Sequence, residues 1–269
     1  MNYTRGDKKT ICTSPRNRTT GALPLFSACE TLYMARFVVA HGAWSAGWAW
    51  KKMHPLMAAA GHEMFTPTWT GIGERRHLAS EQVNLSTHIA DLVQHVETED
   101  HSDVVLLAHS YGGMVATGAM AHIGDRVRQV IYLDAVVPER GQSMLDTADP
   151  AVRDALMQRV AESGSTPWLV PSNPMPPDTP EEDLEWIASR RVEQPLSTFT
   201  EPCPFGATEI TVPKAYIYCL KIGPGDMFGR FATQAQASPD WVYREIDASH
   251  SPNITAPSEL LEMLVGLLV

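Results

Sequence analysis

Cysteine is scarce in this sequence, and its positions exclude two classes of small scaffold. The 269 residues contain four cysteines, Cys12, Cys29, Cys203 and Cys219, which are widely separated and form no CxxC pair. No histidine cluster with the spacing of metal ligands accompanies them, so neither a disulfide framework nor a structural zinc site is indicated. We therefore expect free thiols in a reducing compartment, and hence a cytoplasmic location.

Positive charge and long apolar runs are also lacking. Lys and Arg number 21 against 31 Asp and Glu, and the net charge of −10 repels phosphate backbones and anionic membrane surfaces. No stretch approaches the roughly 20 apolar residues that a membrane-spanning helix requires, and the apolar tail at 260–269 is too short. We therefore expect no nucleic-acid or membrane partner. The partner that we expect is a small-molecule substrate, and the sequence leaves open whether the protein forms a homodimer.

The overall composition is that of an ordinary globular protein, since 44% of the residues are hydrophobic and 19% are charged. Residues 1–33 differ from the rest, because basic residues outnumber acidic ones there and no apolar periodicity is found. We expect a disordered leader over 1–33, with a weak targeting peptide as the alternative. One folded domain is expected over 34–269.

From Arg36 onward, short apolar runs alternate with amphipathic stretches, which is the pattern of a parallel sheet covered by helices. Gly61 can end one of these helices in a left-handed conformation. Strands are predicted at 36–40, 63–66, 104–108, 129–134, 214–220 and 241–246, and helices at 48–60, 85–98, 111–122 and 257–268. The sequence thus predicts an α/β fold with a mostly parallel central sheet flanked by helices.

The alternation stops between about residues 137 and 210. Met- and Trp-containing helical pieces stand there among several prolines. A linker is one interpretation of such a segment. Because the segment lies between two strands of one sheet, however, it must leave and return to the same face, so we interpret it as a helical cap insertion.

The segment with the clearest chemical meaning is LAHSYGG at 107–113, between a predicted strand and a predicted helix. A G-x-S-x-G elbow holds its serine in a strained strand-to-helix turn, where small flanking residues let strand and helix approach each other. Ala108 replaces the first glycine here, but Ala108 and Gly112 are both small. Ser110 also lies at a helix N-terminus, whose dipole favours developing negative charge. We predict that Ser110 is a nucleophile rather than an ordinary loop serine.

A serine nucleophile requires a base, and position selects one of the ten histidines. His250 follows the last predicted strand in IDASHSP, where the order of Ser, acid and His in doubly wound hydrolases ends. We predict His250 as the general base. His109, directly before Ser110, is expected to help line the site.

Five segments carry a specific resemblance: HGAWSAGW, TPTWTGIGERRHL, AHSYGG, YLDAVVPERGQS and DASHSP. Together they resemble the α/β-hydrolase superfamily, and within it the plant methylesterase and hydroxynitrile lyase group with its bacterial esterase-like relatives. The resemblance covers essentially residues 34–269. It implies an α/β-hydrolase fold with a helical cap, no cofactor and no metal. It also implies that the backbone N–H groups of Ala43, in the HG turn, and of Tyr111, after the nucleophile, form the oxyanion hole.

The third member of a Ser-His-acid triad is less evident. In the plant group the acid follows the penultimate strand, but that position here aligns with Ile222 in YIYCLKIGPGDMF. Asp226 is one substitute, provided that the loop reaches back. Asp134, at the end of the preceding strand in YLDA, is the other, and certain haloalkane dehalogenases carry their acid there. We favour Asp134 and keep Asp226 as the alternative, with Asp247 as a weaker candidate.

These residues favour acyl transfer on a small hydrophobic ester, carbamate or lactone. Hydroxynitrile lyases of this group use a Thr in the first-strand loop and a Lys after the catalytic His, where Gly42 and Ser251 stand here. A non-catalytic small-molecule receptor on the same fold is the alternative from a different class. The candidate pocket residues are mainly apolar or aromatic, and they are Trp44, His109, Val137, Met144, Trp168 and Trp186.

Overall fold

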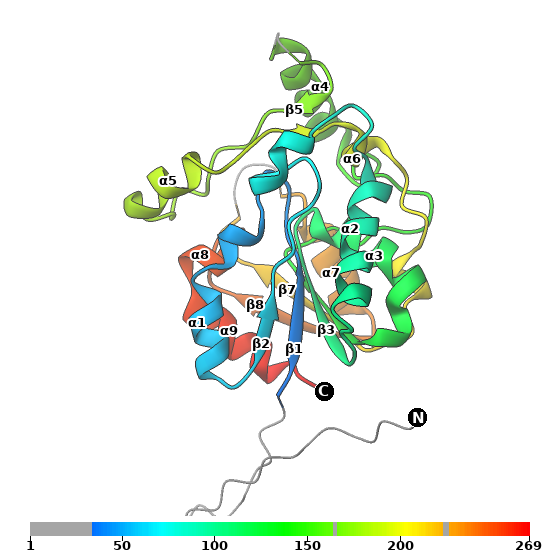
Figure 1. Cartoon of the computed structure of the whole chain (residues 1–269), viewed down its shortest axis with the longest axis vertical. Coiled ribbons are helices and arrows are strands. Elements are labelled where there is room, and N and C mark those ends of the chain that lie inside the picture. The colour runs from blue at the N-terminus through cyan, green and yellow to red at the C-terminus, as the bar shows by residue number, and fades with distance from the viewer. Residues whose placement is uncertain (1–33, 164–165, 223–225) are drawn as a thin grey trace, which may run out of the picture. The chain divides into compact units, whose positions relative to one another are not determined.

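Six strands form one central sheet in the computed structural model, which describes residues 34–163, 166–222 and 226–269 (Figure 1). The strands are β1 (Arg36–Ala40), β2 (Glu63–Phe65), β3 (Val104–His109), β4 (Val127–Leu133), β7 (Lys214–Cys219) and β8 (Trp241–Ile246). Their order is β2-β1-β3-β4-β7-β8, and each neighbouring pair is parallel. This arrangement confirms the predicted α/β fold class.

The predicted leader at 1–33 lies outside the described residues, and so do Cys12 and Cys29. The other two cysteines, Cys203 and Cys219, are buried free thiols. In the described part of the chain, no helix is both long enough and apolar enough to cross a bilayer.

Helices cover both faces of the sheet (Figure 1). The described helices are α1 (Met53–Ala59), α2 (Leu85–Thr98), α3 (Gly112–Ile123), α4 (Pro150–Glu162), α5 (Glu181–Ala188), α6 (Ser197–Thr200), α7 (Gly229–Ala237), α8 (Pro252–Thr255) and α9 (Pro257–Gly266), with short 3-10 turns η1 (Gly47–Trp50), η2 (Gly73–Leu78), η3 (Gly124–Arg126) and η4 (Ala207–Glu209). Successive side chains of β3 alternate between two hydrophobic clusters. Leu106 and Ala108 join the cluster under α2, α3 and α7, while Val105 and Leu107 join the one under α1 and α9. Burial on both faces explains why β3 is a continuous apolar run.

The predicted elements are found close to their expected positions, with one clear error. α2 has the predicted bounds because Asn84 caps its first turn and accepts a hydrogen bond from the Thr87 N–H at 3.0 Å. The single helix predicted at 48–60 is wrong, since η1 and α1 are separate. In one continuous helix Pro55 would lie in the interior and clash with a carbonyl one turn earlier, whereas α1 keeps it in the first turn. Gly61 ends α1 with a φ of +82°, as predicted.

The sequence does not predict α7, which connects β7 to β8. This helix buries only Phe231, Ala232 and Ala235, and two of these side chains are small. Such a narrow apolar stripe gives a weak periodic signal.

The chain between β4 and β7 leaves the sheet and lies over the carboxyl ends of the strands (Figure 1). We refer to residues 137–210 as the cap. Besides helices, the cap contains β5 (Leu169–Val170) and β6 (Gln194–Pro195), which pair antiparallel. An ion pair ties it to the residue before α1, with Lys52 Nζ at 2.6 Å from Asp183 Oδ2. The cap thus contains helices, as predicted, together with a short strand pair that the sequence does not predict.

The start of α3 lies in close contact with the backbone of the sheet. A Cβ atom on Gly112 would lie 1.9 Å from the carbonyl oxygen of Ala40, and one on Gly113 would lie 1.8 Å from that of Val136. Only glycine fits at either position, because a backbone carbonyl cannot rotate away as a side chain can. The two glycines therefore let the start of α3 pack against the end of β1 and the loop after β4.

Gly113→Ala should destabilise the protein by about 3 kcal/mol, because its methyl group would overlap a backbone carbonyl. Gly266→Ala is the matched control at the end of α9, where a Cβ would meet nothing within 4 Å. That change should leave stability unchanged or raise it by up to about 1 kcal/mol. Urea unfolding measures both, and equal unfolding free energies for the two variants would contradict the close contact.

Candidate active site

Four loops at one edge of the sheet carry the residues that the sequence predicts for catalysis. The HG turn at 41–43 follows β1, Ser110 follows β3, Asp134 follows β4 and His250 follows β8. Because the strands are parallel, these loops all lie at the carboxyl edge, where sheets of this kind bind their ligands.

Ser110 occupies the strained turn that the sequence predicts. Its φ is +58°, in the left-handed region that residues other than glycine seldom adopt. The turn is held because the Ser110 carbonyl accepts hydrogen bonds from the N–H groups of Gly113 and Val136, both at 3.1 Å. A Cβ atom on Gly42 would lie 2.9 Å from the Ser110 Cβ, so the absence of a side chain lets the HG turn pack directly against the serine.

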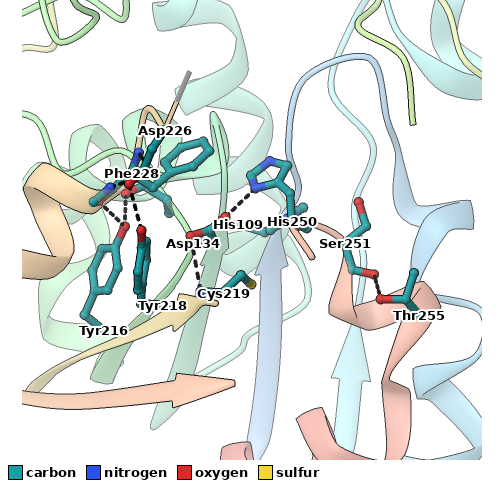
Figure 2. A network of polar contacts seen from close by, with 12 residues as sticks. His109, Asp134, Tyr216, Tyr218, Cys219, Asp226, Phe228, His250, Ser251 and Thr255 are labelled. Carbon is teal, nitrogen blue, oxygen red and sulfur yellow. Dashed lines mark hydrogen bonds and ion pairs between the residues drawn. The ribbon is translucent and has the colours of Figure 1, made fainter. Parts of the chain in front are cut away.

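The imidazole of His250 binds the buried carboxylate of Asp134. His250 Nδ1 lies 2.6 Å from Asp134 Oδ2, and Asp134 is only 5% exposed (Figure 2). A carboxylate only accepts hydrogen bonds, so Nδ1 carries the proton and Nε2 is free to accept one. The other carboxylate oxygen accepts from the Cys219 N–H at 3.4 Å. Asp134 has a φ of +42°, which Asp tolerates better than most residues.

Asp226, the alternative acid, has different partners. Its Oδ2 accepts a hydrogen bond from the Tyr218 hydroxyl at 2.7 Å, and its Oδ1 accepts from the N–H groups of Phe228 and Gly229 at 3.0 and 2.8 Å (Figure 2). These contacts cap the start of α7. Asp247 is exposed on the loop after β8. Of the three aspartates, Asp134 is the one that contacts His250.

Two aromatic rings contact the imidazole of His250. Phe228 stacks on it with ring centres 4.6 Å apart and an interplanar angle of 9°. His109 lies at 4.9 Å, and its Nε2–H donates to the His250 carbonyl at 2.7 Å. Burial lowers the pKa of His109 to about 3, so it is neutral at physiological pH. Sequence reasoning expects His109 here but misses Phe228, because nothing local in GDMFGR marks it.

Two backbone donors beside Ser110 lack a protein partner. Among the described residues, the N–H groups of Ala43 and Tyr111 donate to no protein acceptor. The following N–H, that of Trp44, is satisfied by Gln194 Oε1 at 3.2 Å. Unpaired donors next to a strained serine are what an oxyanion hole requires.

Buried histidines support the backbone behind these donors. His41 Nδ1–H donates to the carbonyl of Gly42 at 2.9 Å. His88 Nε2–H donates to the carbonyl of Thr70, and its Nδ1 accepts from the Tyr111 hydroxyl, both at 3.0 Å. Burial lowers the pKa of His41 and of His88 to about 3, so both are neutral at physiological pH.

The other predicted pocket residues lie in different settings. Trp44, beside the HG turn, is half-buried against Phe199, and Met144 is buried in the cluster under α2, α3 and α7. Trp168 is half-buried, and its carbonyl accepts from the Leu196 N–H at 2.8 Å.

The described contacts of Val137 and Trp186 are with other parts of the chain than the loops of Ser110 and His250. Val137 lines a cavity of about 280 Å³ together with Phe231 and Trp241. Trp186, on α5, packs against Trp48 with ring centres 5.1 Å apart and lies under the ammonium of Lys51. Trp186 thus attaches the cap to the outside of the core. Within the described residues, no group of three or more His, Cys, Asp and Glu side chains is arranged to hold a metal ion.

The chain belongs to the alpha/beta hydrolase family, whose model matches residues 37–263. The carbendazim hydrolyzing esterase of Nocardioides sp. (strain SG-4G) is 34% identical to it over 242 residues, which cover 87% of this chain and 100% of that protein. Salicylic acid-binding protein 2 of Nicotiana tabacum is 31% identical over 104 residues, 38% of this chain and 40% of that protein. These findings confirm the family resemblance, and the chain is a hydrolase of the esterase type.

Solved structures agree on the fold. An extracellular alpha/beta-hydrolase from a Paenibacillus species has a TM-score of 0.75 at 22% identity, covering 86% of this chain and 98% of that one. The methylesterase MES16 from Arabidopsis has a TM-score of 0.70 at 23% identity, covering 87% of this chain and 98% of that one. At these identities the similarity shows the fold alone.

The free energy of unfolding should fall as the pH is lowered from 6.5 toward 3. His41, His88 and His109 have a pKa of about 3 when folded, against 6.5 for an ordinary histidine. Between these values the unfolded chain binds more protons, so stability that is complete above pH 6.5 is lost below it, by up to about 1.4 kcal/mol per pH unit for each histidine.

Urea unfolding at a series of pH values measures this slope. His88→Gln should reduce the slope of unfolding free energy against pH by the contribution of one histidine. His77→Gln, which changes an exposed histidine, should leave the slope as in the wild type. Identical slopes for the two variants would contradict the assignment.

Proposed function

We propose that the chain is a serine esterase in which Ser110 is the nucleophile, His250 the general base and Asp134 the acid that orients the base. The observation that carries this proposal is the 2.6 Å contact between His250 Nδ1 and Asp134 Oδ2, made at the sheet edge where a strained turn presents Ser110. This contact holds the imidazole in the tautomer that can accept a serine proton. The chain order of Ser, Asp and His also agrees with that of α/β-hydrolases.

In the first half of the proposed reaction, His250 Nε2 takes the proton of Ser110 Oγ while Oγ attacks the substrate carbonyl carbon. The carbonyl oxygen becomes an oxyanion, which the N–H groups of Ala43 and Tyr111 stabilise. When the carbonyl re-forms, the bond to the leaving alcohol breaks, and the imidazolium returns its proton to that oxygen. The acyl group is then bonded to Ser110.

In the second half, His250 takes a proton from a water molecule as the water oxygen attacks the acyl carbon. The second oxyanion accepts hydrogen bonds from the same two N–H groups, those of Ala43 and Tyr111. Its collapse breaks the bond to Ser110 Oγ, which regains a proton from the imidazolium, and the carboxylic acid leaves. The cycle needs only the side chains and backbone groups named here and one water.

The surroundings of Ser110 support a small hydrophobic ester or carbamate as the substrate. Trp44 and Phe199 lie beside the HG turn, and Phe228 lies on the imidazole, so an apolar group meets favourable surfaces. Similarity to a carbendazim hydrolyzing esterase favours a carbamate, because carbendazim is a methyl carbamate. Gly42 and Ser251 stand where a cyanohydrin lyase of this group would need Thr and Lys.

Wild-type protein should react with a fluorophosphonate probe and hydrolyse both p-nitrophenyl butyrate and an aryl methyl carbamate. Ser110→Ala should lose the label and lower kcat by about 10⁴-fold or more, because it removes the nucleophile. Ser102→Ala, an exposed serine just before β3, is the control and should keep full activity. Folded wild-type protein that neither reacts nor turns over would refute the proposal and favour a small-molecule receptor.

Asp134→Asn should lower kcat by about 10³- to 10⁴-fold, because the amide no longer holds His250 in the productive tautomer. Asp226→Asn is the matched change at the alternative acid. Because Asn caps helices about as well as Asp, this change should leave the start of α7 intact and keep kcat close to the wild-type value. Steady-state kinetics on the two variants decide between them, and a larger loss at Asp226 would overturn the choice of acid.

A further inference from the structure

The cap holds the residue that follows the oxyanion donor Ala43. Trp44 has a φ of +57°, which is rare for a bulky residue. Its backbone N–H donates to Gln194 Oε1 at 3.2 Å, and its indole Nε1–H donates to the Val170 carbonyl at 2.9 Å. Gln194 and Val170 face each other across the β5–β6 pair. Both strands of the small cap sheet therefore bind one residue of the HG loop.

The side-chain amide of Gln194 is buried, and both its oxygen and its nitrogen have a hydrogen-bond partner. Gln194 is 0% exposed, and while its Oε1 accepts from Trp44, its Nε2 donates to Thr198 Oγ1 at 2.8 Å. Thr198 Oγ1 in turn donates to the Pro195 carbonyl at 2.7 Å, so it must accept from Gln194. This chain of donors fixes the orientation of the amide, because a reversed amide would set its NH2 group against the Trp44 N–H. Leaving that buried N–H unpaired would be costly.

The segment after Gln194 also reaches the second donor loop. Phe199 packs against Trp44 with ring centres 5.8 Å apart and against Tyr111 at 5.6 Å. The Tyr111 hydroxyl is itself fixed by His88. Residues 194–199 therefore contact both loops whose N–H groups we assign to the oxyanion hole.

The HG loop needs such support because of Gly42. Glycine is required there to pack against Ser110, but it restrains the peptide that carries the Ala43 N–H less than any other residue would. His41 holds the carbonyl of this peptide at 2.9 Å, which leaves the Ala43–Trp44 side of the loop to be fixed. The next peptide, which carries the Trp44 N–H, is the one that Gln194 binds. Fixing that peptide limits how far Ala43 can rotate.

We propose that Gln194 is a positioning residue of the oxyanion hole, which holds the Ala43 N–H at the place where the substrate oxygen becomes negative. The inference rests on the serine-esterase function proposed above. Gln194 itself touches no reacting atom and acts through Trp44. The cap is then part of the catalytic apparatus as well as a cover for the substrate.

Gln194→Met tests this role, because Met has a similar length and no group that accepts a hydrogen bond strongly. With p-nitrophenyl butyrate, kcat should fall by about 10- to 100-fold, somewhat less than the loss of a whole oxyanion donor, while KM changes by less than about threefold. A trifluoromethyl ketone, whose adduct with serine carries the oxyanion, should bind more weakly by the factor that kcat/KM loses. A merely structural role would not move that inhibition constant.

Gln129→Met is the matched control. Gln129 is also buried, and its Nε2 donates to the Leu267 carbonyl at 2.8 Å, so its loss should lower stability without changing kcat or the inhibition constant. Thr198→Val is a second test that keeps Gln194 but removes the acceptor for its amide, together with the side-chain hydrogen bond between Thr198 and Tyr111. It should lower kcat by about three- to tenfold and applies even if Gln194→Met fails to fold.

The outcomes separate this inference from the proposed function. Wild-type protein without turnover would overturn both. Active wild-type protein, with kcat and ketone inhibition in Gln194→Met or Thr198→Val equal to those of Gln129→Met, would overturn the role of Gln194 and leave the esterase standing. A fall in kcat without weaker ketone binding would also overturn it.

Discussion

The close contact between α3 and the sheet is the constraint on which the rest of the site depends. Gly112 and Gly113 bring the start of α3 against the carbonyls of Ala40 and Val136, one at the end of β1 and one in the loop after β4. The chain must therefore turn sharply at Ser110, between β3 and α3, where φ is +58°. Such strain persists only where the surroundings fix the backbone, and here a strand buried on both faces does so.

The position of the proposed acid depends on which carboxylate can reach His250, rather than on which strand it follows. Asp134 lies at the end of β4, and β7 separates β4 from the strand that precedes His250, yet the carboxylate and the imidazole meet at 2.6 Å. The loop after β7 then has other contacts. Cys219 donates its N–H to Asp134, Asp226 caps α7, and Phe228 stacks on His250. In the proposed triad the acid therefore follows β4, and Phe228 contacts the imidazole from the chain after β7.

Local patterns in the sequence predict the sheet, the elbow and the histidine, because a buried strand, a glycine-rich turn and a strand-end loop each have local signatures. They leave two aspartates open as the acid, since only the fold shows which carboxylate reaches His250. They also miss Gln194, whose contact with Trp44 spans 150 positions of the chain. The wrong prediction of one helix over 48–60 has a different origin, because Pro55 marks the start of α1 in the sequence itself.

Backbone donors pose a particular problem for an active site, because no side chain of their own fixes them. Gly42 makes the problem sharper here: the missing Cβ that lets the HG turn pack on Ser110 also removes local restraint on the peptide of Ala43. The adjacent His41 holds the carbonyl of that peptide, and the buried, paired amide of Gln194 holds the N–H of the next peptide from a distant segment. The proposed roles of Gln194 and Ser110 therefore predict that substitutions in the cap change the rate of ester hydrolysis without altering Ser110, His250 or Asp134.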